Sequence, residues 1–147
     1  MSEAVYLGNP NLKKANVAQE WTKEQIEEYA RCMKDPIYFI RTYIRIVSLD
    51  EGLVPFEMYD FQKEMVGTFH SNRFTICKLP RQSGKSTTII AYLLHYVLFN
   101  PTVNVAILAN KAATARDLLG RLQLAYEHLP KWLQQGVMSW NKGSLEL

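Results

Sequence analysis

The stretch from residue 74 to residue 98 restricts most strongly what this chain can fold into. It begins with FTICKL, which favours a β-strand, passes through the polar corner PRQSGKS, and continues into TTIIAYLLHYVL, which favours a buried helix. Residues 104–109 then predict a second buried strand, and residues 112–128 predict a helix that ends before Pro130. Strand, loop, helix, strand and helix in this order predict an α/β fold with a parallel sheet.

The polar corner has the form of a phosphate-binding loop. The pattern G-x-x-x-x-G-K-[ST] fits residues 79–86, except that Leu79 stands in place of the first glycine. In such a loop, backbone amides and a helix N-terminus surround the phosphate. Gly84 would let the backbone approach the phosphate, Lys85 would reach its β- and γ-oxygens, and Ser86 would bind Mg²⁺. The alternative is a tight turn with an exposed lysine.

Two further residues are candidates for contacts with a nucleotide. Arg81 could fold over the γ-phosphate and stabilise charge in the transition state, or it could be a solvated arginine paired with a carboxylate. Gln62 can both donate and accept hydrogen bonds, as the edge of adenine requires, although glutamine is also common on helix surfaces. The complete predicted nucleotide-binding set is Gln62, Pro80, Arg81, Gln82, Ser83, Gly84, Lys85, Ser86 and Thr87.

The chain divides into three parts. Residues 1–20 have no hydrophobic period and predict a flexible leader, residues 21–58 predict an N-terminal helical segment, and residues 59–147 predict the first part of an ATPase domain. In the helical segment, TKEQ at residues 22–25 has the form of a capping box and predicts a helix to about residue 34. A second helix should begin at Asp35. Its core-facing stripe is expected to be Ile37, Ile40, Ile44 and Val47.

Other turns and helix ends are also predicted. Residues 48–60 predict a loop that ends at Asp60, the expected N-cap of a short helix. Asn110 is the expected N-cap of the helix that follows it. The tail from residue 137 to residue 147 resembles one arm of a hairpin whose second arm is missing.

Composition adds limits to this interpretation. A chain of 147 residues with 48% hydrophobic residues can bury a core, and its net charge of +3 is too small to identify nucleic acid as a partner. We expect Cys32 and Cys77 to be reduced, buried thiols. The most apolar run, residues 87–99, is shorter than the roughly 20 residues that a bilayer span needs, and no signal peptide is recognisable. We therefore expect a soluble intracellular protein.

Four stretches, taken in order, carry a resemblance to a known family: YDFQKEMV, TICKLPRQSGKSTTIIAYLLHYVLFN, VAILANKAATARDLLGRL and LPKWLQQGVMSWNKGSLEL. Together they resemble the N-terminal ATPase domain of the large terminase subunit, the DNA-packaging motor of T-even-like tailed bacteriophages. The resemblance implies an ASCE, helicase/RecA-like P-loop NTPase fold, here an incomplete parallel sheet flanked by helices. It also implies that Arg81 and Lys85 are catalytic and that Gln62 contacts adenine. Glu57 replaces a second glutamine of the family.

The resemblance further implies cofactors and partners. ATP and Mg²⁺ would be the cofactors, and hydrolysis would drive double-stranded viral DNA into the procapsid. The implied protein partners are the portal protein, the small terminase subunit, further copies of the chain on the portal, and the downstream remainder of the large subunit. The implied location is the host cytoplasm, without a membrane. The Walker B acidic residues and the nuclease domain are absent from these 147 residues, so little turnover is expected from this chain alone.

Two other functions fit the same residues. A helicase-like or repair ATPase also combines an adenine-reading glutamine with a phosphate loop, and ILANK would then contact DNA. A non-catalytic assembly module that binds portal or capsid protein would keep only a vestigial loop.

Overall fold

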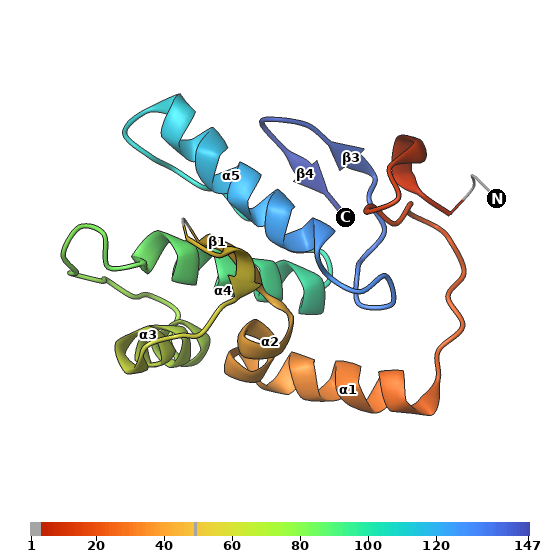
Figure 1. Cartoon of the computed structure of the whole chain (residues 1–147), viewed down its shortest axis with the longest axis horizontal. Helices are drawn as coiled ribbons and strands as arrows, with labels where there is room; N and C mark the ends of the chain where they lie inside the picture. Colours follow the sequence, from red (N-terminus) through yellow and green to blue (C-terminus); the bar gives the residue numbers. More distant parts are fainter. Residues whose placement is uncertain (1–3, 49) are drawn as a thin grey trace.

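The computed structural model describes residues 4–48 and 50–147 and is mainly helical (Figure 1). The helices in these residues are η1 (Tyr6–Gly8), α1 (Lys23–Lys34), α2 (Pro36–Tyr43), α3 (Asp60–Ser71), α4 (Lys85–Phe99) and α5 (Ala112–Glu127). The strands are β1 (Arg45–Ser48), β2 (Gly52–Pro55), β3 (Ser139–Trp140) and β4 (Leu145–Glu146).

Helix α4 is the central element of the structure. It contacts α5 on one side and α2 and α3 on the other, while α1 packs against α2 (Figure 1). The helix is apolar around most of its circumference, and such a helix is stable in water only when neighbours cover several faces. Its buried side chains are Thr88, Ile90, Ala91, Leu94, His95, Leu98 and Phe99. None of the helices in the described residues is long and apolar enough to cross a membrane.

The predicted parallel sheet, and with it the P-loop NTPase fold, is wrong. The sheets formed by the described residues are two antiparallel pairs, β1 with β2 and β3 with β4. Residues 74–79 and 104–109, the predicted parallel strands, are extended but pair with no strand in the described chain. An apolar, β-branched composition suits a sheet, but a strand forms only where a neighbour completes its backbone hydrogen bonds. The side chains of Ile76 and Leu108 are 97% and 87% exposed.

The two predicted N-terminal helices are present with their predicted caps. The Thr22 hydroxyl accepts a hydrogen bond from the Gln25 backbone N–H at 3.2 Å, and Gln25 Oε1 accepts one from the Thr22 N–H at 3.1 Å. This reciprocal pair is the capping box. Asp35 Oδ1 accepts from the Tyr38 N–H at 2.9 Å, and Pro36 occupies the first position of α2. Both helix starts are therefore confirmed.

The predicted core stripe of the second helix is only partly correct. Helix α2 ends at Tyr43, so that Ile44 and Val47 do not lie on it. Ile44 is buried, but Val47 lies in β1 and is 64% exposed. The predicted loop is replaced by the β1–β2 hairpin, in which Gly52 has a φ of 74°. Glycine adopts this left-handed conformation without a side-chain clash, which favours the turn.

Two further turn predictions need correction. The N-cap of α3 is Tyr59, and Asp60 is its first helical residue. The C-terminal tail contains both arms of a hairpin, since β3 pairs with β4. Asn141 Oδ1 accepts hydrogen bonds from the N–H groups of Gly143 and Ser144, at 2.9 and 2.8 Å. An asparagine side chain that bonds to the backbone ahead of it stabilises a tight turn, which explains why the chain reverses here.

The two cysteines differ in environment. Cys32 is buried, and the loss of solvent raises the pKa of its thiol to about 12, assisted by the nearby Glu28 carboxylate. Cys77 is exposed, so the prediction that both thiols are buried is wrong for this residue. It lies in the extended segment that has no neighbouring strand to cover it.

Glu28 joins α1 to α2. Its Oε1 atom accepts hydrogen bonds from the hydroxyl groups of Tyr38 and Tyr43, at 2.8 and 2.9 Å. Burial and this carboxylate raise the pKa of Tyr43 far above that of a free phenol, so the hydroxyl stays protonated and remains a donor.

Gln134 joins the N-terminal segment to the end of α5. Its Nε2 atom donates to the carbonyl oxygens of Asn11 and Tyr126, at 2.9 and 3.1 Å, and its Oε1 atom accepts from the Lys13 N–H at 3.0 Å. Gln134 is 3% exposed, and Leu12, between its two N-terminal partners, is 2% exposed. These contacts place residues 11–13 against the core.

We predict that Gln134→Ala lowers the free energy of unfolding by about 3 kcal/mol, because several buried backbone groups lose their partner at once. Urea denaturation followed by circular dichroism measures this change. The control is Gln135→Ala, which removes one hydrogen bond, from Nε2 to the Leu98 carbonyl, and should cost about 1 kcal/mol. Equal losses in both variants would contradict the special role of Gln134.

Candidate phosphate-binding site

The loop before α4 curls back on the carbonyl group of Pro80. The Ser83 hydroxyl and the Lys85 ammonium group both donate to this oxygen, at 3.0 and 3.1 Å. Two residues in the curl have left-handed backbones, Gln82 with a φ of 60° and Gly84 with a φ of 74°. The loop predicted from the sequence therefore has a defined, compact shape, and it leads directly into the N-terminus of a 15-residue helix.

A row of backbone donors lies where the curl meets the helix. Among the described residues, the N–H groups of Gly84, Lys85, Ser86 and Thr87 have no hydrogen-bond partner, and the Thr88 N–H is the first to bond, to the Gly84 carbonyl at 3.0 Å. The first N–H groups of any helix lack partners within it, and together they carry a partial positive charge. Here they adjoin the curl that holds Lys85, which adds a full positive charge.

Gln62 lies directly behind the loop and is 2% exposed. Its Oε1 atom accepts from the Tyr59 N–H at 2.9 Å, and its Nε2 atom lies 3.4 Å from the Ser83 carbonyl oxygen, to which it donates. The side chain thus connects the N-terminus of α3 to the loop. Its predicted contact with adenine stays a prediction, and one N–H of Nε2 and one lone pair of Oε1 are not used by these two bonds.

Gly84 lies close to the side chain of Gln62 from α3. A Cβ atom at this position would lie 2.6 Å from Gln62 Nε2, and the φ of 74° is one that residues with side chains rarely adopt. The backbone conformation favours glycine here, and a side chain at this position would displace the end of the Gln62 side chain.

Arg81 lies at the exposed tip of the curl. Within the described chain it forms no ion pair or hydrogen bond, so the predicted pairing with a carboxylate is not present there.

The charged residues in the sequence around the loop are all basic. Residues 65–116 contain no aspartate or glutamate. The basic residues in this stretch are Arg73, Lys78, Arg81, Lys85, Lys111 and Arg116. Of the remaining residues, eleven are basic and fourteen acidic, so the net charge of +3 combines a basic stretch of +6 with a surplus of −3 elsewhere. A stretch of this charge attracts anions.

The structure brings most of the predicted residues together. Gln62, Pro80, Ser83 and Lys85 contact one another through the bonds described above, and Ser86 and Thr87 follow in the first turn of α4. The sequence analysis missed Thr88, whose hydroxyl donates to the Gly84 carbonyl at 3.0 Å. A threonine four residues after a loop glycine can make this bond within a helix, so the spacing was an available signal.

The helix cap predicted at the end of residues 104–109 is not formed as expected. The N-cap of α5 is Lys111 and not Asn110, and no side chain caps this helix. Both residues are exposed.

The donor set suits phosphate better than a metal held by the protein alone. The described residues contain no group of three or more His, Cys, Asp or Glu side chains that could hold a metal ion. Ser86 would supply one hydroxyl ligand, and phosphate oxygens and water would have to complete the coordination of Mg²⁺. Mg²⁺ fits this site only together with a phosphate ligand.

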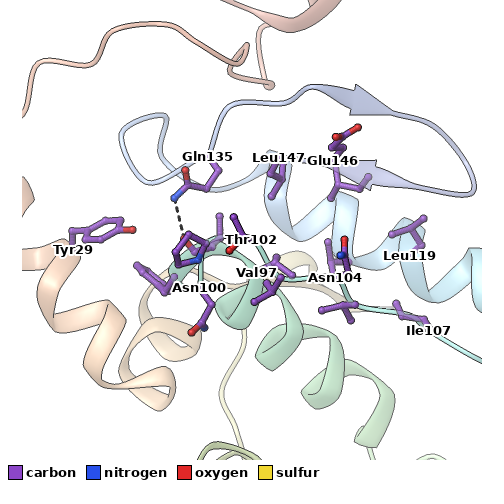
Figure 2. A pocket seen from close by; sticks show the side chains of 17 residues that line it. Tyr29, Val97, Asn100, Thr102, Asn104, Ile107, Leu119, Gln135, Glu146 and Leu147 are labelled. Carbon is purple, nitrogen blue, oxygen red and sulfur yellow. Dashed lines mark hydrogen bonds between the residues drawn. The ribbon is translucent and has the colours of Figure 1, made fainter.

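A cavity of about 760 Å³ lies elsewhere, between the second half of α4, the extended residues after it, α5 and β4 (Figure 2). Aliphatic side chains such as Val97, Ile107 and Leu119 form much of its wall, and Gln135 Nε2 donates to the Leu98 carbonyl at its edge. The predicted nucleotide-binding residues do not line it.

No family model matches the sequence.

We predict that Gly84→Ala destabilises the protein by about 2 kcal/mol, since alanine disfavours a left-handed backbone and Gln62 must leave the Ser83 carbonyl. The matched control is Gly120→Ala in α5, where a Cβ atom meets nothing within 4 Å. That substitution should stabilise the helix by up to about 1 kcal/mol. Denaturant unfolding of both variants checks the pair, and a neutral Gly84→Ala would show that the loop is not held as described.

Proposed function

We propose that the loop from Pro80 to Ser86 binds the phosphate groups of ATP, and that the chain is the N-terminal, ATP-binding part of a viral terminase large subunit. The observation that carries the first part is the row of unpaired N–H groups from Gly84 to Thr87 beside the Lys85 ammonium group. The resemblance in sequence supports the second part.

Each residue of the loop has a distinct task in this proposal. The N–H groups at the start of α4 bind phosphate oxygens, and Lys85 neutralises their charge. Ser86 would hold Mg²⁺, which would shield the phosphate charge. Arg81, free of protein partners in the described chain, reaches the γ-phosphate and stabilises the charge that develops during transfer.

Hydrolysis would need groups that this stretch does not supply. A carboxylate usually holds the metal or orients the attacking water, and residues 65–116 contain none. We propose that the remainder of the large subunit provides it, in the same or a separate chain. Double-stranded DNA, the portal protein, the small terminase subunit and further copies of the chain are the other proposed partners.

One observation favours the alternative of a non-catalytic assembly module. Phe74, Ile76 and Leu108 are 81%, 97% and 87% exposed, and large apolar side chains on a surface often mark contacts with other proteins. The module and the motor differ in one respect, because only the motor requires the loop to bind nucleotide. A helicase-like ATPase would also bind nucleotide, and would differ by unwinding a duplex.

We predict that Lys85→Ala weakens ATP binding by at least about tenfold, since a charge-assisted hydrogen bond contributes about 1.5–3 kcal/mol. Lys78→Ala is the control, because this exposed lysine has the same charge but precedes the curl. Isothermal titration with ATP, with and without Mg²⁺, measures both affinities. No ATP binding by the unaltered chain would support the assembly module instead.

We further predict that Arg81→Ala changes ATP affinity less than twofold but slows hydrolysis in the complete packaging motor, because its target is charge that forms only in the transition state. Comparable arginines contribute about 10³-fold or more to the rate. Steady-state phosphate release with portal and DNA present measures the effect. Arg116→Ala, an exposed arginine on α5, is the control. Equal rates for all three proteins would remove Arg81 from catalysis.

A further inference from the structure

His95 lies at the centre of the contact between α4 and the N-terminal helices. It is 2% exposed. Aromatic rings from three helices surround its imidazole: Phe39 of α2 at 5.4 Å, Phe99 of α4 at 4.8 Å and His70 of α3 at 6.2 Å between ring centroids. Tyr92, one turn earlier on α4, lies nearly parallel to the imidazole at 6.2 Å.

The imidazole also caps a helix that is distant in sequence. His95 Nε2 lies 2.9 Å from the carbonyl oxygen of Cys32, 63 residues away, in the last turn of α1. The last carbonyl groups of a helix have no partner within it, so this contact satisfies one of them. Because a carbonyl oxygen can only accept, Nε2 must carry the proton. The neutral ring in this tautomer is sufficient to make the bond.

The groups that face the imidazole act on its pKa in both directions. Burial lowers the pKa of His95 most strongly, the Cys32 carbonyl raises it, and a charge on His70 lowers it further. Asp35, at the start of α2, raises it. The Cys32 thiol and the Tyr92 hydroxyl stay neutral in this pH range, because burial raises the pKa of each. The net effect is a lowered pKa for His95, so the ring is neutral near pH 7.

We propose that His95 is a proton-sensitive latch, whose protonation on mild acidification loosens the α1–α2 pair from α4. The inference rests on the packing of these helices and is independent of nucleotide binding. A second proton on the ring adds a charge at a position that is 2% exposed, and none of the ion pairs in the described residues involves His95. Opening the helix pair admits water to the charged ring.

The direction of the pH dependence follows from the shifted pKa. A histidine in the unfolded or opened chain has a pKa of about 6.5, and the value in the closed structure is lower. The opened form therefore binds the proton more tightly. Above about pH 6.5 the neutral His95 contributes fully to the stability of the closed form. This contribution falls as the pH decreases from there towards the lower pKa of the closed form.

Hydrogen–deuterium exchange of the full chain at pH 7.5 and pH 5.5, corrected for the intrinsic exchange rate, tests the latch. We expect the equilibrium constant for opening, measured on peptides from α1 and α2, to rise several-fold, up to about tenfold, at the lower pH. His95→Gln keeps a donor for the Cys32 carbonyl but cannot titrate, so its exchange in α1 and α2 should not respond. His128→Gln is the control, because His128 is exposed and bonds only within the end of α5.

An equal response to pH in the unaltered chain and in His95→Gln would overturn the proposal. Nuclear magnetic resonance titration of the imidazole protons gives a second test that does not depend on a variant folding. A pKa for His95 well below about 6.5, the value of a free histidine, supports the latch, whereas a pKa equal to or above that value overturns the latch.

Discussion

The burial of α4 between α5 on one side and α2 and α3 on the other is the constraint on which the structure depends (Figure 1). An apolar helix of 15 residues is stable in water only when neighbouring elements cover its apolar faces. The packing of its neighbours determines where both ends of the helix lie. The N-terminal end presents Lys85 and the unpaired N–H groups, and the second half presents His95 to the end of α1. Both proposed activities therefore belong to one helix, and each is positioned by what packs against it.

The loop before α4 is positioned by helices and not by a sheet. Gln62 from α3 supports the loop at the Ser83 carbonyl, and the absence of a side chain at Gly84 lets the two elements meet. The local requirements for binding an anion, a left-handed glycine, a lysine and a helix N-terminus, are satisfied by short-range geometry. This explains how the chain can contain a compact loop of this kind while residues 74–79, directly before it, pair with no strand in the described residues.

The sequence predicted local features well and long-range pairing poorly. Helix α5 and the capping box at Thr22 depend on residues within one turn of each other, so their signals are complete in the sequence. A strand depends on a partner that periodicity cannot identify, and for this reason the parallel sheet was wrong and the β1–β2 hairpin was missed. The turn from Pro80 to Gly84 was predicted because the signal for it is local. The burial of Gln62 was not found, since it depends on where α3 packs.

The distribution of charge links the loop to its surroundings. Composition gave a net charge of +3, too small to indicate an anionic ligand, because an acidic remainder masks the basic stretch from residue 65 to residue 116. Within that stretch, Lys85 and Arg81 have no neighbouring acid in the sequence with which to pair. A bound phosphate would offset the positive charge of these side chains and would satisfy the free N–H groups. The same lack of carboxylates leaves the stretch without a group to activate water, so binding and cleavage of a triphosphate would require different parts of the proposed motor.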